Sequence, residues 1–131
     1  MKKRRIQNVL RILKEGKVDA LLITDPVNIR YLSGFTGNEA SVLITTEAFF
    51  VLVDSRYTTQ AKQEAPRFQI SKISKRTDDT VKLITRMGLK KVGFDAGNIS
   101  YADFKRLEQG LPHTTFVPIE EPLLKLSLIH I

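Results

Sequence analysis

Residues 41–54 read S-V-L-I-T-T-E-A-F-F-V-L-V-D, and this stretch decides the fold class. Two apolar runs, residues 41–45 and 49–53, are separated by only three residues, a spacing short enough for a β-hairpin. On both sides of them, strand-length apolar runs alternate with segments of helical spacing, and such strands pair in parallel through crossovers. The sequence therefore predicts an α/β fold, three-layer-like, with a mixed sheet of about five to six strands, one antiparallel hairpin and flanking helices.

The other elements are placed by their apolar spacing and by residues that begin and end helices. Helices are expected at residues 3–15, 26–32, 56–65, 77–87 and 101–110, and further strands at 19–24, 68–73, 91–95 and 114–118. Gly16 is expected to end the first helix, and Thr77 or Asp78 to cap the fourth. Residues 120–124 resemble the beginning of another helix.

Length and composition restrict the class of protein. A chain of 131 residues has room for one hydrophobic core. No apolar run approaches the roughly 20 residues that span a bilayer, so we expect a cytoplasmic protein. The absence of cysteine excludes disulfides, thiolate zinc sites and a cysteine nucleophile. The net charge is +7, but the basic residues are scattered and match no nucleic-acid motif, so solvated surfaces are the favoured interpretation over nucleic-acid binding.

Few residues suggest chemistry of their own. The two histidines, His113 and His130, have no metal-ligand partner at helical or turn spacing. Asp25, Asp54 and Asp95 each follow an expected strand, and strands could bring their carboxylates to one sheet edge as a metal site. Each also precedes a helix or a turn, where capping of backbone N–H groups explains it, and capping is the favoured interpretation. The sequence therefore predicts no metal site in this chain.

Two further stretches together carry a family resemblance. Residues 25–37 read D-P-V-N-I-R-Y-L-S-G-F-T-G, and residues 54–57 read D-S-R-Y. Both motifs, at this separation, resemble the N-terminal domain of the creatinase, prolidase and aminopeptidase P family of Xaa-Pro peptidases. The resemblance covers about residues 3–125. It implies the creatinase N-terminal type of α/β domain, without catalytic residues, over residues 1–125.

The same resemblance implies a second domain that these residues do not contain. In the family a C-terminal "pita-bread" domain holds two divalent metals, manganese or cobalt, and cleaves the peptide. Residues 126–131 depart from the family pattern and are interpreted as a divergent tail. The chain by itself is therefore expected to bind no cofactor and to be inactive, as part of a metal-dependent hydrolase.

Carried onto this sequence, the family motifs imply two groups of site residues. The first is a substrate-gating loop that approaches the active site of a neighbouring subunit: Phe35, Thr36, Gly37, Asn38 and Glu39. The second is a structural group that anchors the loop and the junction after the hairpin: Asn28, Tyr31, Asp54, Arg56 and Tyr57. Phe35 is expected to pack beneath the loop.

The resulting functional hypothesis is the non-catalytic N-terminal domain of a prolidase-like Xaa-Pro dipeptidase. Its expected contributions are dimerisation and the gating loop. The implied partners are the catalytic domain, a second copy of the subunit and a proline-containing peptide. Two alternatives stay open: a stand-alone module that binds peptide, protein or nucleic acid, and a carboxylate-metal nuclease.

Overall fold

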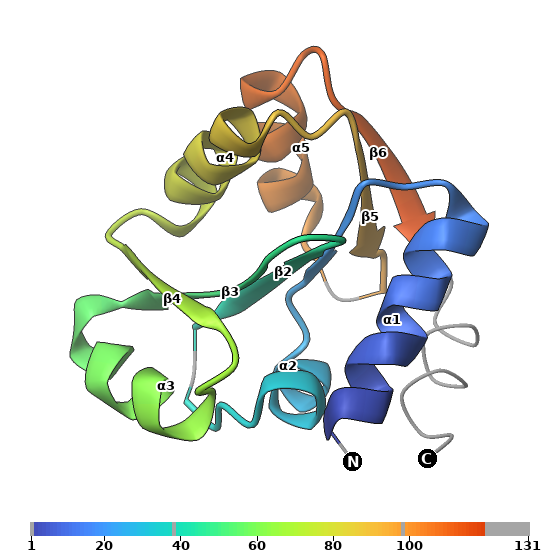
Figure 1. Ribbon diagram of the computed structural model, residues 1–131. Helices are drawn as coiled ribbons and strands as arrows, with labels where there is room; N and C mark the ends of the chain where they lie inside the picture. Colours follow the sequence, from blue (N-terminus) through green and yellow to red (C-terminus); the bar gives the residue numbers. More distant parts are fainter. Residues whose placement is uncertain (1, 38, 98, 120–131) are drawn as a thin grey trace.

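The computed structural model describes residues 2–37, 39–97 and 99–119, with side chains from residue 6 onward (Figure 1). The helices are α1 (Lys2–Gly16), α2 (Pro26–Ser33), the short 3₁₀ helix η1 (Ser55–Tyr57), α3 (Thr58–Glu64), α4 (Arg76–Met87) and α5 (Tyr101–Gly110). The strands are β1 (Ala20–Ile23), β2 (Ser41–Thr45), β3 (Phe49–Asp54), β4 (Gln69–Ile73), β5 (Lys91–Asp95) and β6 (Thr115–Ile119). The helix expected at 120–124 and the divergent tail lie outside the described residues. Within the described part, no helix has the length and apolar character needed to cross a membrane.

The six strands form one mixed sheet in the order β4-β3-β2-β1-β5-β6. Strand β2 runs antiparallel to both neighbours, whereas the pairs β3–β4, β1–β5 and β5–β6 are parallel. The predicted mixed sheet and its hairpin are thus confirmed. The pairing of β1 with β2, which places the hairpin in the middle of the sheet, was not part of the prediction.

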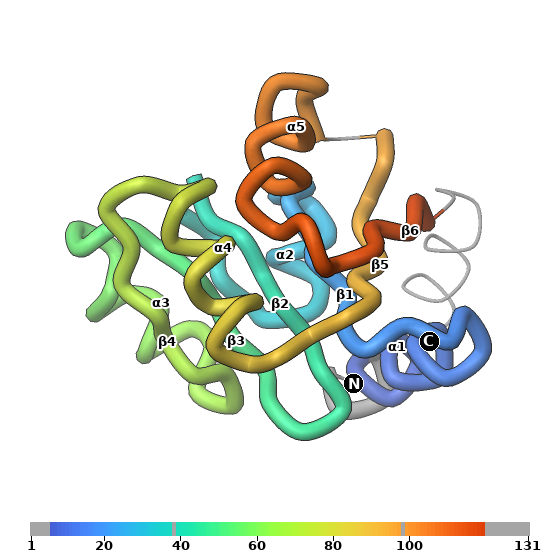
Figure 2. Tube along the Cα trace, turned by 90° about the horizontal axis from the view of Figure 1, so that it is seen from above, coloured from blue at the N-terminus to red at the C-terminus, as the bar shows by residue number. Residues whose placement is uncertain are grey.

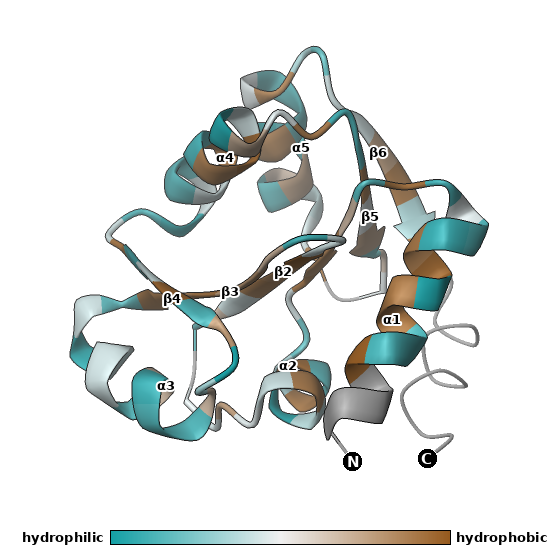
Figure 3. Cartoon of the chain, in the orientation of Figure 1, coloured by the Kyte–Doolittle hydropathy of each residue, from teal (hydrophilic) through white to brown (hydrophobic). Residues whose placement is uncertain are grey.

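Helices cover both faces of the sheet, in three layers (Figures 1 and 2). Side chains of a strand alternate between the faces. Accordingly, Leu21 and Ile23 join the core beneath α1, α2 and α3, whereas Ala20 and Leu22 join the core beneath α4 and α5. Colouring by hydropathy shows apolar strands between helices whose apolar and hydrophilic residues alternate (Figure 3).

The end of α1 differs from the prediction. Gly16 is still helical, and the residue in the left-handed conformation is Lys17, with φ 54°. The Lys17 amide donates to the Lys14 carbonyl (3.3 Å) and the Val18 amide to the Leu13 carbonyl (3.1 Å). This bonding satisfies the last helical carbonyls in the way a C-terminal glycine usually does. The helix therefore ends at Gly16, as predicted, and the difference is that the left-handed residue is the one after the glycine.

Replacing Lys17 with glycine should stabilise the protein by about 1 kcal/mol, because a side chain in the left-handed conformation costs about this much. Urea denaturation measures the change as a shift of the unfolding midpoint. Lys14→Gly, inside the same helix, is the matched control and should destabilise by about 1 kcal/mol. A destabilised Lys17→Gly variant would contradict the prediction.

The start of α4 is also different from the prediction. The helix begins at Arg76, and its N-cap residue, Lys75, offers no side-chain hydrogen bond. Instead Asp79 reaches back from inside the helix, and its carboxylate accepts the backbone N–H groups of Ser74 (2.8 Å) and Lys75 (3.0 Å). Capping by Thr77 or Asp78 was therefore wrong, since the helix begins at Arg76 and both residues lie inside its first turn.

Candidate functional site

The two stretches that carry the family resemblance meet at one edge of the sheet. They follow β1 and β3, and both of these strands are antiparallel to the β2 strand between them. The carboxyl ends of β1 and β3 therefore lie at the same edge. This edge presents the loop that we call the 35–39 loop, together with η1 and α3.

Helix α2, which leads into the 35–39 loop, is capped at both ends. Asp25 is the N-cap, and its carboxylate accepts the Val27 amide (3.2 Å). At the other end Gly34 adopts φ 91°, a conformation that glycine takes readily. The buried Ser33 hydroxyl donates to the Ile29 carbonyl (2.6 Å) and accepts the Phe35 amide (3.1 Å). The direction in which the chain leaves the helix is thereby fixed.

Phe35 holds the loop from below, as expected. Its side chain is 1% exposed and belongs to the core beneath α1–α3. The ring lies edge-on to Tyr57 of η1, with ring centroids 6.2 Å apart. Gly37 lies directly against the same ring, because a Cβ atom there would come within 2.4 Å of Phe35 Cζ. Phe35 thus joins the two motifs, and Gly37 leaves room for its ring.

A second anchor is made by α3. The Thr36 amide donates to Glu64 Oε1 (2.8 Å), and the Thr36 hydroxyl donates to the same carboxylate (3.0 and 3.1 Å). Gln60 Nε2 donates to Thr36 Oγ1 (3.1 Å). Neither Gln60 nor Glu64 was predicted from the sequence. They lie 24 and 28 residues from Thr36, and no local pattern marks them.

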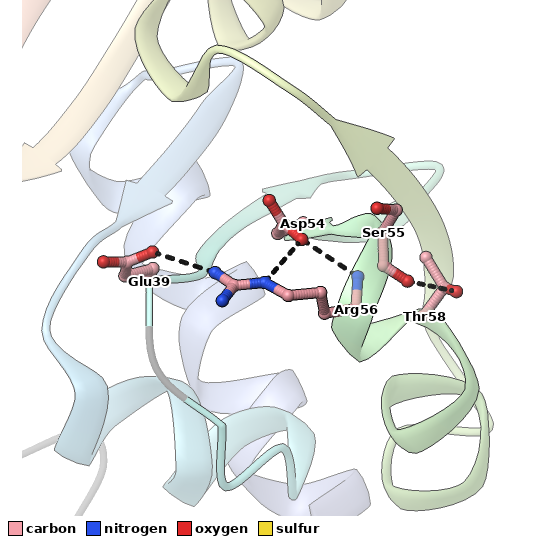
Figure 4. Close-up of polar contacts among 5 residues, drawn as sticks. All are labelled: Glu39, Asp54, Ser55, Arg56 and Thr58. Atoms are coloured by element: carbon pink, nitrogen blue, oxygen red, sulfur yellow. Dashed lines mark hydrogen bonds and ion pairs between the residues drawn. The ribbon is translucent and has the colours of Figure 1, made fainter.

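A third contact joins the far end of the loop to the D-S-R-Y motif (Figure 4). Asp54 Oδ1 accepts both the Arg56 backbone amide (2.9 Å) and Arg56 Nε (3.1 Å). The same guanidinium reaches Glu39, with 3.8 Å between Nη2 and Oε2. Glu39 has φ 56°, which is uncommon for a residue with a side chain. The Arg56 side chain is 69% exposed, so this contact lies at the surface.

The remaining predicted site residues contribute differently. Tyr31 is half-buried and packs against the core beneath α1–α3. Asn28 is half-buried on α2. Asn38 lies outside the described residues. The structure therefore brings Phe35, Thr36, Gly37, Glu39 and the Asp54–Tyr57 motif together.

The local hydrogen bonds shift the pKa values of these groups. The Thr36 backbone N–H lowers the pKa of Glu64 below 4.5, with smaller contributions from the Thr36 hydroxyl and Gln60. The Arg56 backbone N–H, followed by its side chain, lowers the pKa of Asp54. In return the Asp54 carboxylate raises the pKa of Arg56. All of these charges are therefore present at neutral pH.

The Glu64 anchor predicts acid release of the loop. Because the folded-state pKa of Glu64 is lowered, its contribution is present above pH 4.5 and is lost as the pH falls through the folded value. In that range we expect the Thr36 amide to lose protection against hydrogen exchange, relative to its intrinsic rate at the same pH, and to shift its NMR resonance. Glu64→Gln should exchange faster at neutral pH and lose this titration, whereas Glu47→Gln, an exposed control, should behave as the wild type. A Thr36 amide that does not respond to either change would contradict the anchor.

The carboxylates at the sheet edge bind backbone groups. Asp95 is 5% exposed, and its oxygens accept the Thr24 amide, the Thr24 hydroxyl and the Asp25 amide, each at 2.9 Å. Burial is the main influence on Asp95 and raises its pKa. Asp25 and Asp54 each accept the backbone N–H two residues further on, in agreement with the capping interpretation, whereas Asp95 binds the junction of β1 and α2 and not the turn that follows it. In the parts of the chain that the structure describes, no cluster of three His, Asp or Glu side chains could hold a metal ion.

The fold and the site define a class of protein: a small α/β domain that presents an anchored loop at one sheet edge. Comparison with known proteins makes this specific. The chain belongs to the Creatinase/Prolidase N-terminal domain family, whose profile matches residues 5–129. It is thus homologous to the N-terminal domain of Xaa-Pro peptidases, as the sequence motifs predicted.

Individual relatives agree with this assignment. The uncharacterized peptidase YqhT of Bacillus subtilis (strain 168) is 31% identical over 129 residues, which cover 95% of this chain and 36% of the relative. A solved Xaa-Pro aminopeptidase chain from Streptococcus thermophilus is 32% identical with a TM-score of 0.86, covering 96% of this chain and 97% of that chain. The Xaa-Pro dipeptidase of Bacillus anthracis shares the fold, with a TM-score of 0.87 at 24% identity over 95% of this chain and 35% of that chain. The chain thus spans about a third of the length of its curated relative.

Proposed function

We propose that this chain is the non-catalytic N-terminal domain of a metal-dependent Xaa-Pro dipeptidase, and that the 35–39 loop gates the substrate end of the active site. The observation that carries the proposal is that the loop is anchored by Phe35 in the core and by Thr36 on Glu64, beside the exposed Glu39–Arg56 contact. Loops that shape binding sites are held in this way on rigid scaffolds.

The proposal assigns peptide cleavage to a catalytic domain outside these residues. The matched relative is about three times as long as the matched segment, which leaves room for such a domain. The two divalent metals that the family resemblance implies, manganese or cobalt, are assigned in this proposal to that domain, since no metal-ligand cluster is found among the described side chains. Bound there, they would activate water and polarise the peptide carbonyl. The compartment in this proposal is the cytoplasm.

The exposed Glu39–Arg56 contact places a guanidinium group at the end of the loop, where a ligand can bind it. Exposed ion pairs contribute about 0–1 kcal/mol to stability, so the contact with Glu39 holds the Arg56 side chain only weakly. The Arg56 guanidinium can exchange Glu39 for an acidic group on a peptide or on a second subunit, while Asp54 keeps it oriented. In this proposal a homodimer brings the loop to the neighbouring active site.

A kinetic experiment on the protein that joins this domain to its catalytic domain tests the gating role. Arg56→Gln should lower kcat/KM for an Xaa-Pro dipeptide about tenfold, because a hydrogen bond to a charged group is lost. Metal content and thermal stability should hardly change, since the Arg56 side chain is exposed. Arg11→Gln, on the exposed surface of α1, is the control and should have wild-type kinetics. An unchanged kcat/KM for Arg56→Gln would refute the gating role.

A parallel assay on the 131-residue chain tests the assignment of catalysis. With manganese and an Xaa-Pro dipeptide, the pure chain should release no proline. Metal-dependent turnover would contradict the proposal. Binding to nucleic acid, with log affinity falling linearly in log salt, would favour the stand-alone binding module instead.

A further inference from the structure

A separate cavity lies at the same sheet edge, on the opposite face from the 35–39 loop. It has a volume of about 280 Å³ and lies between the end of β1 and the first turns of α4 and α5. In the sheet β1 lies between β2 and β5. The chain passes from β1 to β2 on one side, and it reaches β5 on the other side only later, after α4. Such a reversal of strand order is where ligands bind in open α/β sheets.

One wall of the cavity carries Arg76, whose side chain is hydrogen-bonded to the protein. Arg76 Nε donates to the Ser41 hydroxyl (3.1 Å), and the Arg76 carbonyl accepts the Thr80 hydroxyl (2.7 Å). Ser41 is 2% exposed and Thr80 is 3% exposed, so these anchors are part of the protein interior. Among the described residues the Nη groups of Arg76 have no hydrogen bond or ion pair. The bond to the buried Ser41 hydroxyl therefore orients the guanidinium of Arg76, an exposed residue, and its terminal donors are available to a ligand.

The wall formed by α5 carries the opposite charge. Asp103 lines the cavity, and its backbone amide is fixed by the Ser100 hydroxyl (3.1 Å). Its carboxylate has a distant ion-pair partner, Arg106, with 3.9 Å between Nη1 and Oδ1. Between the two charged walls the lining is mostly polar, and Leu22 and Leu107, which close its bottom, are almost fully buried. The cavity thus combines a cation and an anion in a mostly polar lining.

We propose that this cavity binds a free α-amino acid. The carboxylate of the amino acid pairs with the Nη groups of Arg76, in the fork geometry that guanidinium groups offer. Its ammonium group pairs with Asp103. The volume is just below the roughly 300–1,000 Å³ of pockets for drug-sized ligands, which suits a smaller occupant.

The pair of charges selects this chemistry over simpler ions. An inorganic anion would meet repulsion from Asp103, and an amine without a carboxylate would meet repulsion from Arg76. The inference does not depend on the proposed peptidase role, because binding is measured on the chain itself. A chain of this size from a relative has been solved as a separate structure, so the domain folds without a second domain.

The binding experiment compares matched probes. Each is titrated into the 131-residue chain up to about 10 mM, a range that detects millimolar dissociation constants, with binding followed by amide NMR shifts. L-leucine and L-proline should bind saturably and shift the amides around Ser41, Thr77 and Asp103. N-acetyl-L-leucine, which lacks the ammonium group, and L-leucinamide, which lacks the carboxylate, should each bind at least about tenfold more weakly. Inorganic phosphate should not compete.

Two variants and a control locate the site. Arg76→Gln and Asp103→Asn should each weaken L-leucine binding at least about tenfold, since each removes one charged partner. Arg86→Gln, near the other end of α4, should bind like the wild type. Unfolding midpoints of all variants establish that the effect is on binding.

Three results would overturn the inference. The first is the absence of saturable binding of either amino acid to the wild-type chain. The second is binding of phosphate or N-acetyl-L-leucine as tightly as L-leucine, which would show a plain anion site. The third is wild-type affinity in a folded Arg76→Gln variant.

Discussion

Replacing Phe35 with alanine is expected to lower the free energy of unfolding by about 3–5 kcal/mol, the usual cost of deleting a buried phenylalanine ring. The ring is 1% exposed and packs in the core beneath α1–α3. It also lies edge-on to Tyr57 and beneath Gly37, so its loss removes the contact between the loop and η1. The variant should therefore be less stable, and its loop should be less ordered.

Two measurements separate these effects. Urea denaturation gives the loss of stability, and hydrogen exchange at Thr36 and Glu39 under native conditions gives the opening of the loop. Tyr101→Ala is the control, because Tyr101 is 75% exposed and its removal should change stability by less than about 0.5 kcal/mol. If Phe35→Ala is as stable as Tyr101→Ala, Phe35 is not the anchor of the loop.

The second large effect is expected at Asp95. Asp95→Ala should cost on the order of 3 kcal/mol, because it leaves the Thr24 and Asp25 amides and the Thr24 hydroxyl without their carboxylate acceptor. These donors lie at the end of β1, where the chain turns into α2. The loss therefore affects the central strand and the helix that leads to the 35–39 loop.

The pH dependence of this cost has a definite sign. Burial raises the folded-state pKa of Asp95 above 3.8, so its contribution is present below pH 3.8 and decreases as the pH rises through the folded value. The penalty of Asp95→Ala should therefore be larger near pH 4 than at pH 7. Urea denaturation of the wild type and the variant at both values measures this difference.

Asp25→Ala provides the comparison. Asp25 accepts one backbone amide as a helix N-cap, so its removal should cost only about 1 kcal/mol. Equal losses of stability for Asp25→Ala and Asp95→Ala would show that the buried hydrogen bonds of Asp95 stabilise the protein no more than a single helix N-cap does.

Much of the fold was predictable because its signals are local. The apolar runs at 41–45 and 49–53 became β2 and β3, and Pro26 and Ser100 lie at the starts of α2 and α5 as expected. The paired motifs at 25–37 and 54–57 gave the family. The errors were also local. At the end of α1 the left-handed residue is Lys17 instead of Gly16, and α4 begins one residue before Thr77, with the Ser74 amide bound by Asp79.

The sequence by itself determined the alternation of strands and helices, the hairpin and the family, because periodicity and capping act over a few residues. Only the tertiary structure decided that the hairpin pairs with β1, that Glu64 holds Thr36, and that Arg76 and Asp103 line one cavity. These contacts join residues about 25 apart in the sequence, and their geometry depends on how whole helices pack against the sheet. No local pattern encodes that packing.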